Sequence, residues 1–141
     1  INISNISEAN TFYVNQAYLE KGKGIVNDRY YENFKEKKEQ VTLISLEEIN
    51  AFNNQVNQNI EPKDFRRNII VSGIDLNKLI DKQIKINQVI LQIHEICQPC
   101  KYLQDRLKLP SLVKLLVNKS GVRAEIIKSG NLSVGDTLKK I

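Results

Sequence analysis

Two cysteines, Cys97 and Cys100, are the only thiols of the chain and stand in the sequence Cys97-Gln98-Pro99-Cys100. A cysteine acts as a nucleophile or as a ligand of a soft metal in its thiolate form. Pro99 suits the first position of a helix, which places Cys100 in a first turn where unpaired backbone N–H groups favour a negative sulfur. Lys101 adds a positive charge next to it. The segment therefore predicts thiolate chemistry centred on Cys100.

Four interpretations of this pair stay open on the residues alone. The first is that both thiols are small buried side chains. The second is a dithiol redox site, because Cys97-Gln98-Pro99-Cys100-Lys101 is similar to the C-G-P-C-K stretch of thioredoxins. The third is zinc bound by His94, Cys97 and Cys100, a set one ligand short of a closed structural site. The fourth is a single thiolate ligand to molybdenum.

A second group of polar residues lies in Phe65-Arg66-Arg67-Asn68-Ile69-Ile70-Val71. The β-branched run predicts a strand over 65–71, with Arg66 and Asn68 on one face and Arg67 on the other. An arginine fork and an amide on the same face can bind a phosphate. The alternative is that both arginines are solvated charges at a rim. Arg29, after the turn Gly22-Lys23-Gly24, is a weaker candidate for the same anion.

The elements that must position these residues are mostly short strands. Ser45 and Glu48 make a capping-box pattern that predicts a helix reaching Val56. Turn signals about every 8–12 residues indicate a β-barrel or sandwich, mainly β, with a few short helices. Strands are expected at 1–6, 12–19, 40–44, 65–71, 84–86, 89–96, 122–128 and around 134–136, and helices at 45–56, 99–109 and 111–117.

The bulk properties fit a protein of one domain spanning residues 1–141. The net charge is +5, but the basic residues are spread along the chain without a block of like charge, which argues against a nucleic-acid-binding stripe. No apolar run reaches the length of a membrane span, and no signal-peptide pattern begins the chain. Free thiols at close spacing indicate a reducing compartment, so we expect a cytoplasmic protein that binds neither nucleic acid nor membrane.

Segments along almost the whole chain share the order and spacing of one known family. They are 24–30 (G-I-x-G-D-R-H/Y), 40–43 (Q-V-S/T-L), 65–76 (F-R-x-N-I…G-I-D-L), Pro99-Cys100 (P-C), 121–126 (G-V-x-A-x-V) and 130–136 (G-x-L-x-x-G-D). The chain therefore resembles the MOSC family, the molybdenum cofactor sulfurase C-terminal domain, in its small standalone bacterial type. Asn27 and Asn87 stand where that family usually has glycine, which predicts positive φ at both.

The resemblance implies a closed or partly open β-barrel and a molybdenum cofactor of the molybdopterin type. Cys100 would ligate the molybdenum or carry sulfur, and Arg66 and Asn68 would hold the pterin phosphate. Further cofactor-binding positions implied by the resemblance are Ser45, Arg29 and Gln98. Pyridoxal phosphate is not expected, because the sulfurase half that binds it has no counterpart in the chain.

The family implies two possible functions, and the cysteine spacing adds a third. The first is reduction of small N-hydroxylated compounds at a Cys100-ligated molybdenum, with electrons from a separate reductase. The second is a sulfur-carrier or cofactor-sulfuration module that takes sulfur from a donor without turnover. The third, from the cysteine spacing, is a thiol–disulfide protein that uses both thiols.

Overall fold

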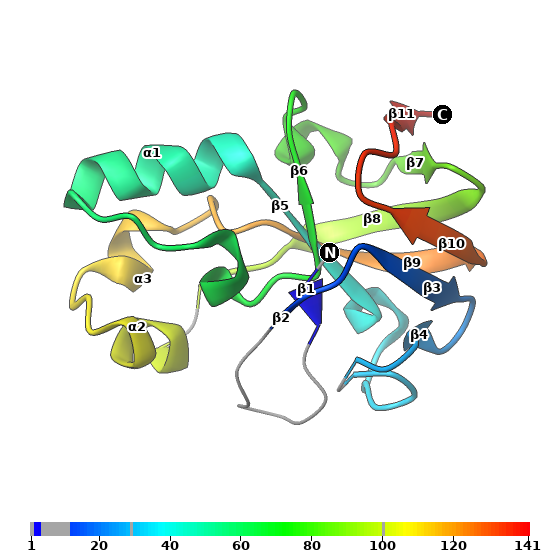
Figure 1. The fold of residues 1–141 in the computed structure, drawn as a ribbon, viewed down its shortest axis with the longest axis horizontal. Coiled ribbons are helices and arrows are strands. Elements are labelled where there is room, and N and C mark those ends of the chain that lie inside the picture. Colours follow the sequence, from blue (N-terminus) through cyan, green and yellow to red (C-terminus); the bar gives the residue numbers. More distant parts are fainter. Residues whose placement is uncertain (1, 4–11, 29, 100) are drawn as a thin grey trace.

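The computed structural model describes residues 2–3, 12–28, 30–99 and 101–141 of the chain, and strands dominate this described part (Figure 1). Its strands are β1 (Asn2–Ile3), β2 (Phe12–Tyr13), β3 (Gln16–Glu20), β4 (Gly24–Ile25), β5 (Val41–Ser45), β6 (Ile69–Val71), β7 (Gln83–Ile86), β8 (Val89–Ile96), β9 (Val122–Lys128), β10 (Gly130–Ser133) and β11 (Leu138–Lys140). Its helices are α1 (Leu46–Val56), α2 (Lys101–Leu107) and α3 (Leu112–Leu115), with 3-10 turns η1 (Lys37–Glu39), η2 (Pro62–Phe65) and η3 (Leu76–Leu79). The predicted mainly-β class is confirmed.

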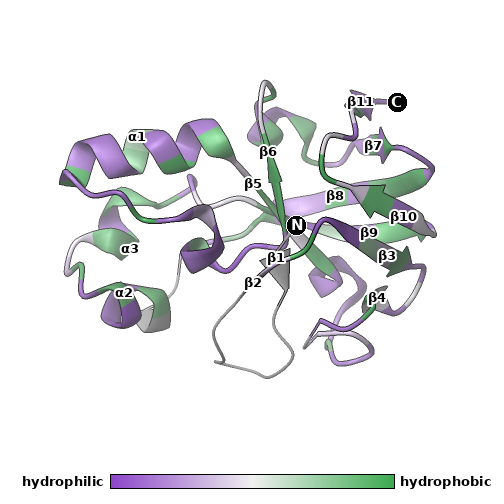
Figure 2. Ribbon diagram, in the orientation of Figure 1, coloured by the Kyte–Doolittle hydropathy of each residue, from purple (hydrophilic) through white to green (hydrophobic). Residues whose placement is uncertain are grey.

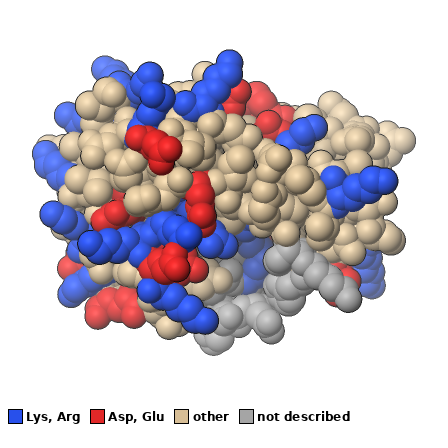
Figure 3. All heavy atoms as spheres, turned by 180° about the vertical axis from the view of Figure 1, so that it is seen from behind, with Lys and Arg blue, Asp and Glu red and all other residues tan. Residues whose placement is uncertain are grey.

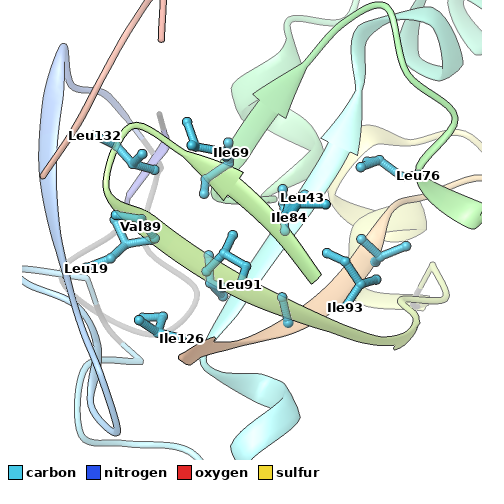
Figure 4. Close-up of a cluster of buried hydrophobic side chains, with 14 of the residues drawn as sticks. Leu19, Leu43, Ile69, Leu76, Ile84, Val89, Leu91, Ile93, Ile126 and Leu132 are labelled. Carbon is cyan, nitrogen blue, oxygen red and sulfur yellow. The ribbon is translucent and has the colours of Figure 1, made fainter. Parts of the chain in front are cut away.

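Two sheets enclose the main core. The larger has the strand order β11-β7-β8-β9-β5-β6, in which all neighbours are antiparallel except the parallel pair β5 and β6. The smaller sheet, β10-β3-β4, contributes Leu19 and Leu132 to the same cluster as Leu91 and Ile126 of the larger one (Figure 4). The strands thus form a curled half-barrel, which confirms the partly open form of the predicted barrel.

The alternation of residues in β8 and β9 explains how the core is filled. Every second side chain is buried over most of each strand, as expected where one face of a sheet meets a core. Fully burying a leucine or isoleucine stabilises a fold by about 1.5–3 kcal/mol. The inward residues are Val89, Leu91, Ile93, Val122, Ala124 and Ile126.

The three α-helices lie together at the end of the molecule away from β7 and β11 (Figure 1). Ser45 begins α1 as predicted, since its side chain accepts a hydrogen bond from Glu48 N at 3.1 Å. Asn57 ends the helix with φ 54°. Apolar and polar residues alternate around α1 in Figure 2, and the apolar ones enter a second cluster. That cluster contains Ile44, Ile49, Phe52, Phe65, Leu103, Leu112 and Leu116.

Of the strand expected at 1–6, only Asn2–Ile3 (β1) lies within the described residues. Three other predicted strands differ from the structure. The strand expected at 65–71 begins only at Ile69, because Pro62 opens the 3-10 turn η2 and Arg66 follows it with φ 61°. The strand expected at 12–19 is two strands, β2 and β3. The strand expected around 134–136 is a turn between β10 and β11, in which the Asp136 side chain accepts a hydrogen bond from Ser133 N at 2.8 Å. In the first and third cases a local cap or turn outweighs the β propensity of its neighbours.

The predicted asparagine turns are confirmed. Asn27 has φ 74° and Asn87 has φ 54°, so both take a left-handed conformation that glycine adopts most readily. Asn87 lies between β7 and β8, and its Nδ2 donates to Asn131 O at 3.0 Å. The turn therefore ties the larger sheet to the strand β10 of the smaller one.

On the face shown in Figure 3, lysine and arginine side chains are interspersed with aspartate and glutamate. Most of this charge lies over the strand-rich end. Within the described ranges, no helix has both the length and the apolar character needed to cross a bilayer.

Candidate functional site

The basic-amide segment and the cysteine segment meet at one end of the larger sheet. Strand β8 ends just before Cys97, β9 starts just after Gly121, and β6 starts just after Asn68. Because β9 pairs with both β8 and β5, and β5 pairs with β6, these strand ends lie near one another. Residues 31 positions apart in sequence, Arg67 and Gln98, are consequently in contact.

Arg67 makes that contact with its guanidinium group. Its Nε donates to Ser120 O at 2.8 Å, and its Nη2 donates to Gln98 O at 3.2 Å and to Ser120 Oγ at 3.4 Å. Both carbonyls lie beyond the strand ends, where the sheet ladder offers no donor. Arg67 is half-buried, so it is a structural cross-link rather than the solvated rim charge of the alternative interpretation.

The loop before β9 is fixed tightly against Cys97. Ser120, only 1% exposed, donates from Oγ to Cys97 O at 2.6 Å, and Cys97 N donates to Gly121 O at 2.8 Å. Gly121 has φ 99°, and a Cβ there would stand 2.1 Å from Leu43 O. Only glycine allows this approach of the two backbones.

Cys97 is a buried free cysteine beside the guanidinium of Arg123. Burial works to lower the pKa of Arg123, but the hydrogen bond and charge interaction with Cys97, together with Glu95 and Glu39, outweigh it and raise the pKa. Arg123 Nη1 lies 3.5 Å from Glu95 Oε1 and 3.7 Å from Glu39 Oε1. The position after β8 therefore places a thiol next to a permanent positive charge.

Gln98 turns its side chain to the loop that precedes Ser120. Its Nε2 donates to Asn118 Oδ1 at 2.6 Å, and its Oε1 accepts from Asn118 N at 2.9 Å. Asn118 O in turn accepts from Asn77 Nδ2 at 2.8 Å. A continuous set of amide hydrogen bonds thus links the cysteine segment to the segment after β6.

That segment forms one wall of a pocket of about 330 Å³ at the ends of β5 and β6. Glu47, which belongs to the first turn of α1, accepts a hydrogen bond from Gly73 N, and Asp75 accepts one from Asn77 N at 3.1 Å. Lys119, an exposed residue, contributes the positive charge of the lining. The lining residues are Ser45, Glu47, Glu48, Gly73, Ile74, Asp75, Leu76, Asn77, Lys119 and Gly121.

Asn68 is buried and bound to Thr42 of the neighbouring strand. Its Oδ1 accepts from Thr42 N at 3.0 Å and from Thr42 Oγ1 at 3.1 Å, while Thr42 Oγ1 accepts from Asn68 N at 2.9 Å. The backbone donor fixes the orientation of the amide, because only the oxygen can accept from Thr42 N. Because an anion needs a hydrogen-bond donor, Nδ2 is the side-chain atom of Asn68 that can bind one.

The other predicted cofactor-binding residues lie in different surroundings. Arg66 follows η2 in the left-handed conformation, and its Nη2 is fully buried. Ser45 caps α1 and lines the pocket, and Gln98 reaches the same region through Asn118. Cys100 and Arg29 lie outside the described residues.

His94 pairs with Glu125 across β8 and β9, with 3.0 Å between Nε2 and Oε1. Within the described ranges, no three histidine, cysteine or acidic side chains come together as a metal site. The zinc interpretation needs Cys100, so it stays a prediction.

Sequence reasoning did not assign a role to Asn77, Asn118 or Glu47, or to Arg67 as a cross-link. Asn118 is one of the residues with positive φ, but nothing in its sequence neighbourhood indicates that it pairs with Gln98. Asp75 and Asn77 follow the Gly73-Ile74 pair that carried part of the family resemblance. That motif is the feature of the sequence that could have indicated a site at this wall of the pocket.

Comparisons with known proteins agree with this architecture. The family model of the MOSC domain matches residues 30–139, so the chain belongs to the MOSC domain family. No curated protein matches the sequence.

Solved structures share the fold at low identity. The YuaD protein from Bacillus subtilis is 19% identical, with a TM-score of 0.79 over 97% of this chain and 90% of that chain. YiiM from Geobacillus stearothermophilus is 16% identical, with a TM-score of 0.80 over 100% of this chain and 72% of that one. YiiM from Escherichia coli is 15% identical, with a TM-score of 0.73 over 89% of this chain and 62% of that one.

Proposed function

We propose that this MOSC-family protein, as one domain over residues 1–141, binds a molybdenum cofactor of the molybdopterin type where its basic-amide and cysteine segments meet. The observation that carries the proposal is the direct contact of Arg67 with Gln98, which brings the Arg66-Arg67-Asn68 segment beside the residues leading to Cys100. An anion-binding segment and a thiol in one place suit a ligand with a phosphate at one end and a soft metal at the other.

The donor chemistry of the described residues fits such a ligand. Arg66 presents a planar, permanently charged group, and the Thr42 bonds engage the Asn68 amide oxygen, so that the donor of the amide is its nitrogen. These two residues would hold the phosphate, with Cys100 as the ligand of molybdenum and Ser45, Arg29 and Gln98 around the cofactor. When bound, the cofactor supplies the two-electron chemistry at the metal.

The reaction we propose is reduction of small N-hydroxylated compounds in the cytoplasm. The pocket lined by Asn77 and Lys119 is large enough for a small organic substrate and carries hydrogen-bonding groups on its wall. Two cysteines are too few for an iron–sulfur cluster held by four thiolates. We propose a separate reductase as the source of electrons.

The test is elemental analysis for molybdenum and zinc on the chain purified without oxygen from a host that makes the cofactor. We expect molybdenum near one atom per chain, lost in Cys100→Ala and reduced in Arg66→Gln and Asn68→Ala, and retained in Cys97→Ser. Zinc in place of molybdenum would contradict the proposal in favour of a zinc site. Absence of both metals, with a persulfide or a disulfide found by mass spectrometry, would support the sulfur-carrier or the thiol–disulfide function instead.

A further inference from the structure

Arg67 binds backbone carbonyls of two other segments, unlike its neighbours Arg66 and Asn68, which we propose to bind the phosphate. Its guanidinium bridges the carbonyls of Gln98 and Ser120, one after β8 and the other before β9. A planar group with donors along two edges can serve both acceptors at once, whereas a lysine ammonium on a flexible stem cannot hold the same geometry. Arg67 therefore fixes the spacing of two chain segments where the ladder between them has ended.

Gln98 is the point at which this contact acts on the cysteine segment. Its side chain is held by Asn118 and its carbonyl by Arg67, so both parts of the residue are fixed. Pro99, which follows, is buried and has a restricted backbone. A displacement of the Gln98 carbonyl would consequently move Pro99, the last described residue before Cys100.

We propose that Arg67 is a positioning residue, which sets the place of the backbone leading to Cys100 relative to the anion-binding pair Arg66 and Asn68. The inference rests on the proposed function, because a fixed spacing between thiol and phosphate anchor matters only for a ligand that bridges them. Misplacement of a binding group by about 1 Å can cost large factors in function. Arg67 would thus act on the cofactor through the backbone and not by touching it.

The test compares Arg67→Lys and Arg67→Gln with the unchanged chain. Hydrogen exchange of the Cys97 amide reports the local structure, since that amide donates to Gly121 O. Loss of hydrogen bonds from a charged donor is expected to raise its exchange about tenfold. The amides of Leu91 and Ile93 in the middle of β8 should exchange as before. Molybdenum retained after dialysis should fall severalfold in both variants.

A control separates positioning from general stability. Ile126→Val removes one methyl group from the core away from this contact, so it should lower the unfolding temperature while leaving the relative exchange of Cys97 and the molybdenum content unchanged. Wild-type molybdenum content in Arg67→Lys, or exchange raised equally at Cys97 and in β8, would overturn the role of Arg67. Absence of molybdenum from the unchanged chain would instead reject the proposed function, and the exchange data would then decide whether Arg67 fixes the segment.

Discussion

Gln98 and Asn118 bind each other reciprocally, with the Gln98 amide nitrogen 2.6 Å from Asn118 Oδ1 and its oxygen 2.9 Å from Asn118 N. The pair joins the cysteine segment to the loop that carries Lys119 and Ser120. Through Asn118 O it also reaches Asn77, in the wall of the pocket. The geometry of the pocket and that of the thiol segment are therefore coupled by amide groups.

Gln98→Ala should lower the free energy of unfolding by about 1 kcal/mol, because both hydrogen bonds of the pair are lost at an exposed position. Asn118→Gly keeps the positive φ of this residue and removes only its side-chain acceptor. Urea unfolding of the two variants and of the double variant gives the coupling energy. Additive effects would contradict a direct interaction, and Gln88→Ala at an exposed turn serves as the control.

Gly121→Ala should prevent folding or cost about 3 kcal/mol or more, because the added Cβ would overlap Leu43 O and the residue has φ 99°. The matched control is Gly73→Ala, where φ is 78° but no atom lies within 4 Å of the added Cβ. That variant measures the backbone cost alone, about 1–2 kcal/mol. Thermal unfolding that ranks both variants equally would show that the overlap is relieved by movement of the loop.

The pH dependence of stability should include a contribution from Tyr31 and Glu20. The Tyr31 hydroxyl donates to Glu20 Oε1 at 2.6 Å, and this bond, with smaller contributions from burial and nearby charge, raises the pKa of Tyr31 to about 12. The same bond lowers the pKa of Glu20. The stabilisation is therefore complete below the ordinary tyrosine pKa of 10.0 and is lost as the pH rises towards about 12.

At acidic pH the stability contribution of the pair changes in the opposite direction, because it decreases as the pH falls. The contribution of Glu20 is present above its ordinary pKa of 4.5 and is lost as the pH falls through its lowered value. Tyrosinate absorbance should show a step near pH 12 that disappears in Tyr31→Phe and persists in Tyr18→Phe. A step near 12 that survives in Tyr31→Phe would refute the assignment.

Thr42→Val should destabilise the protein by about 2 kcal/mol, because it removes the hydroxyl that both donates to Asn68 Oδ1 and accepts from Asn68 N. It should also loosen the Asn68 amide and so reduce molybdenum retention. Thr42→Ser keeps the hydroxyl and should retain both properties nearly unchanged. Equal molybdenum content in the valine and serine variants would show that the orientation of Asn68 does not matter for binding.

The sequence alone determined the mainly-β class, the hairpin of β7 and β8, the start of α1 at Ser45 and the strand β9. These features depend on local signals: alternation of apolar residues, a capping side chain, and an asparagine tolerant of positive φ. The family motifs also identified the segments that meet at the site. Each motif is a short run of residues, so it is visible without knowledge of its neighbours in space.

Only the tertiary structure decided which groups the side chains within those motifs contact. The spacing in 65–71 predicts a strand with Arg66 and Asn68 on one face. In the structure the turn η2, which starts at Pro62, comes first, and the strand begins only at Ile69. Arg67 therefore lies outside the strand and donates a hydrogen bond to Gln98 O. The partner of each polar group is set by which strands end together, and strand order is a long-range property. That is why the Arg67 cross-link, the Gln98–Asn118 pair and the pocket at β5 and β6 emerged only from the folded chain.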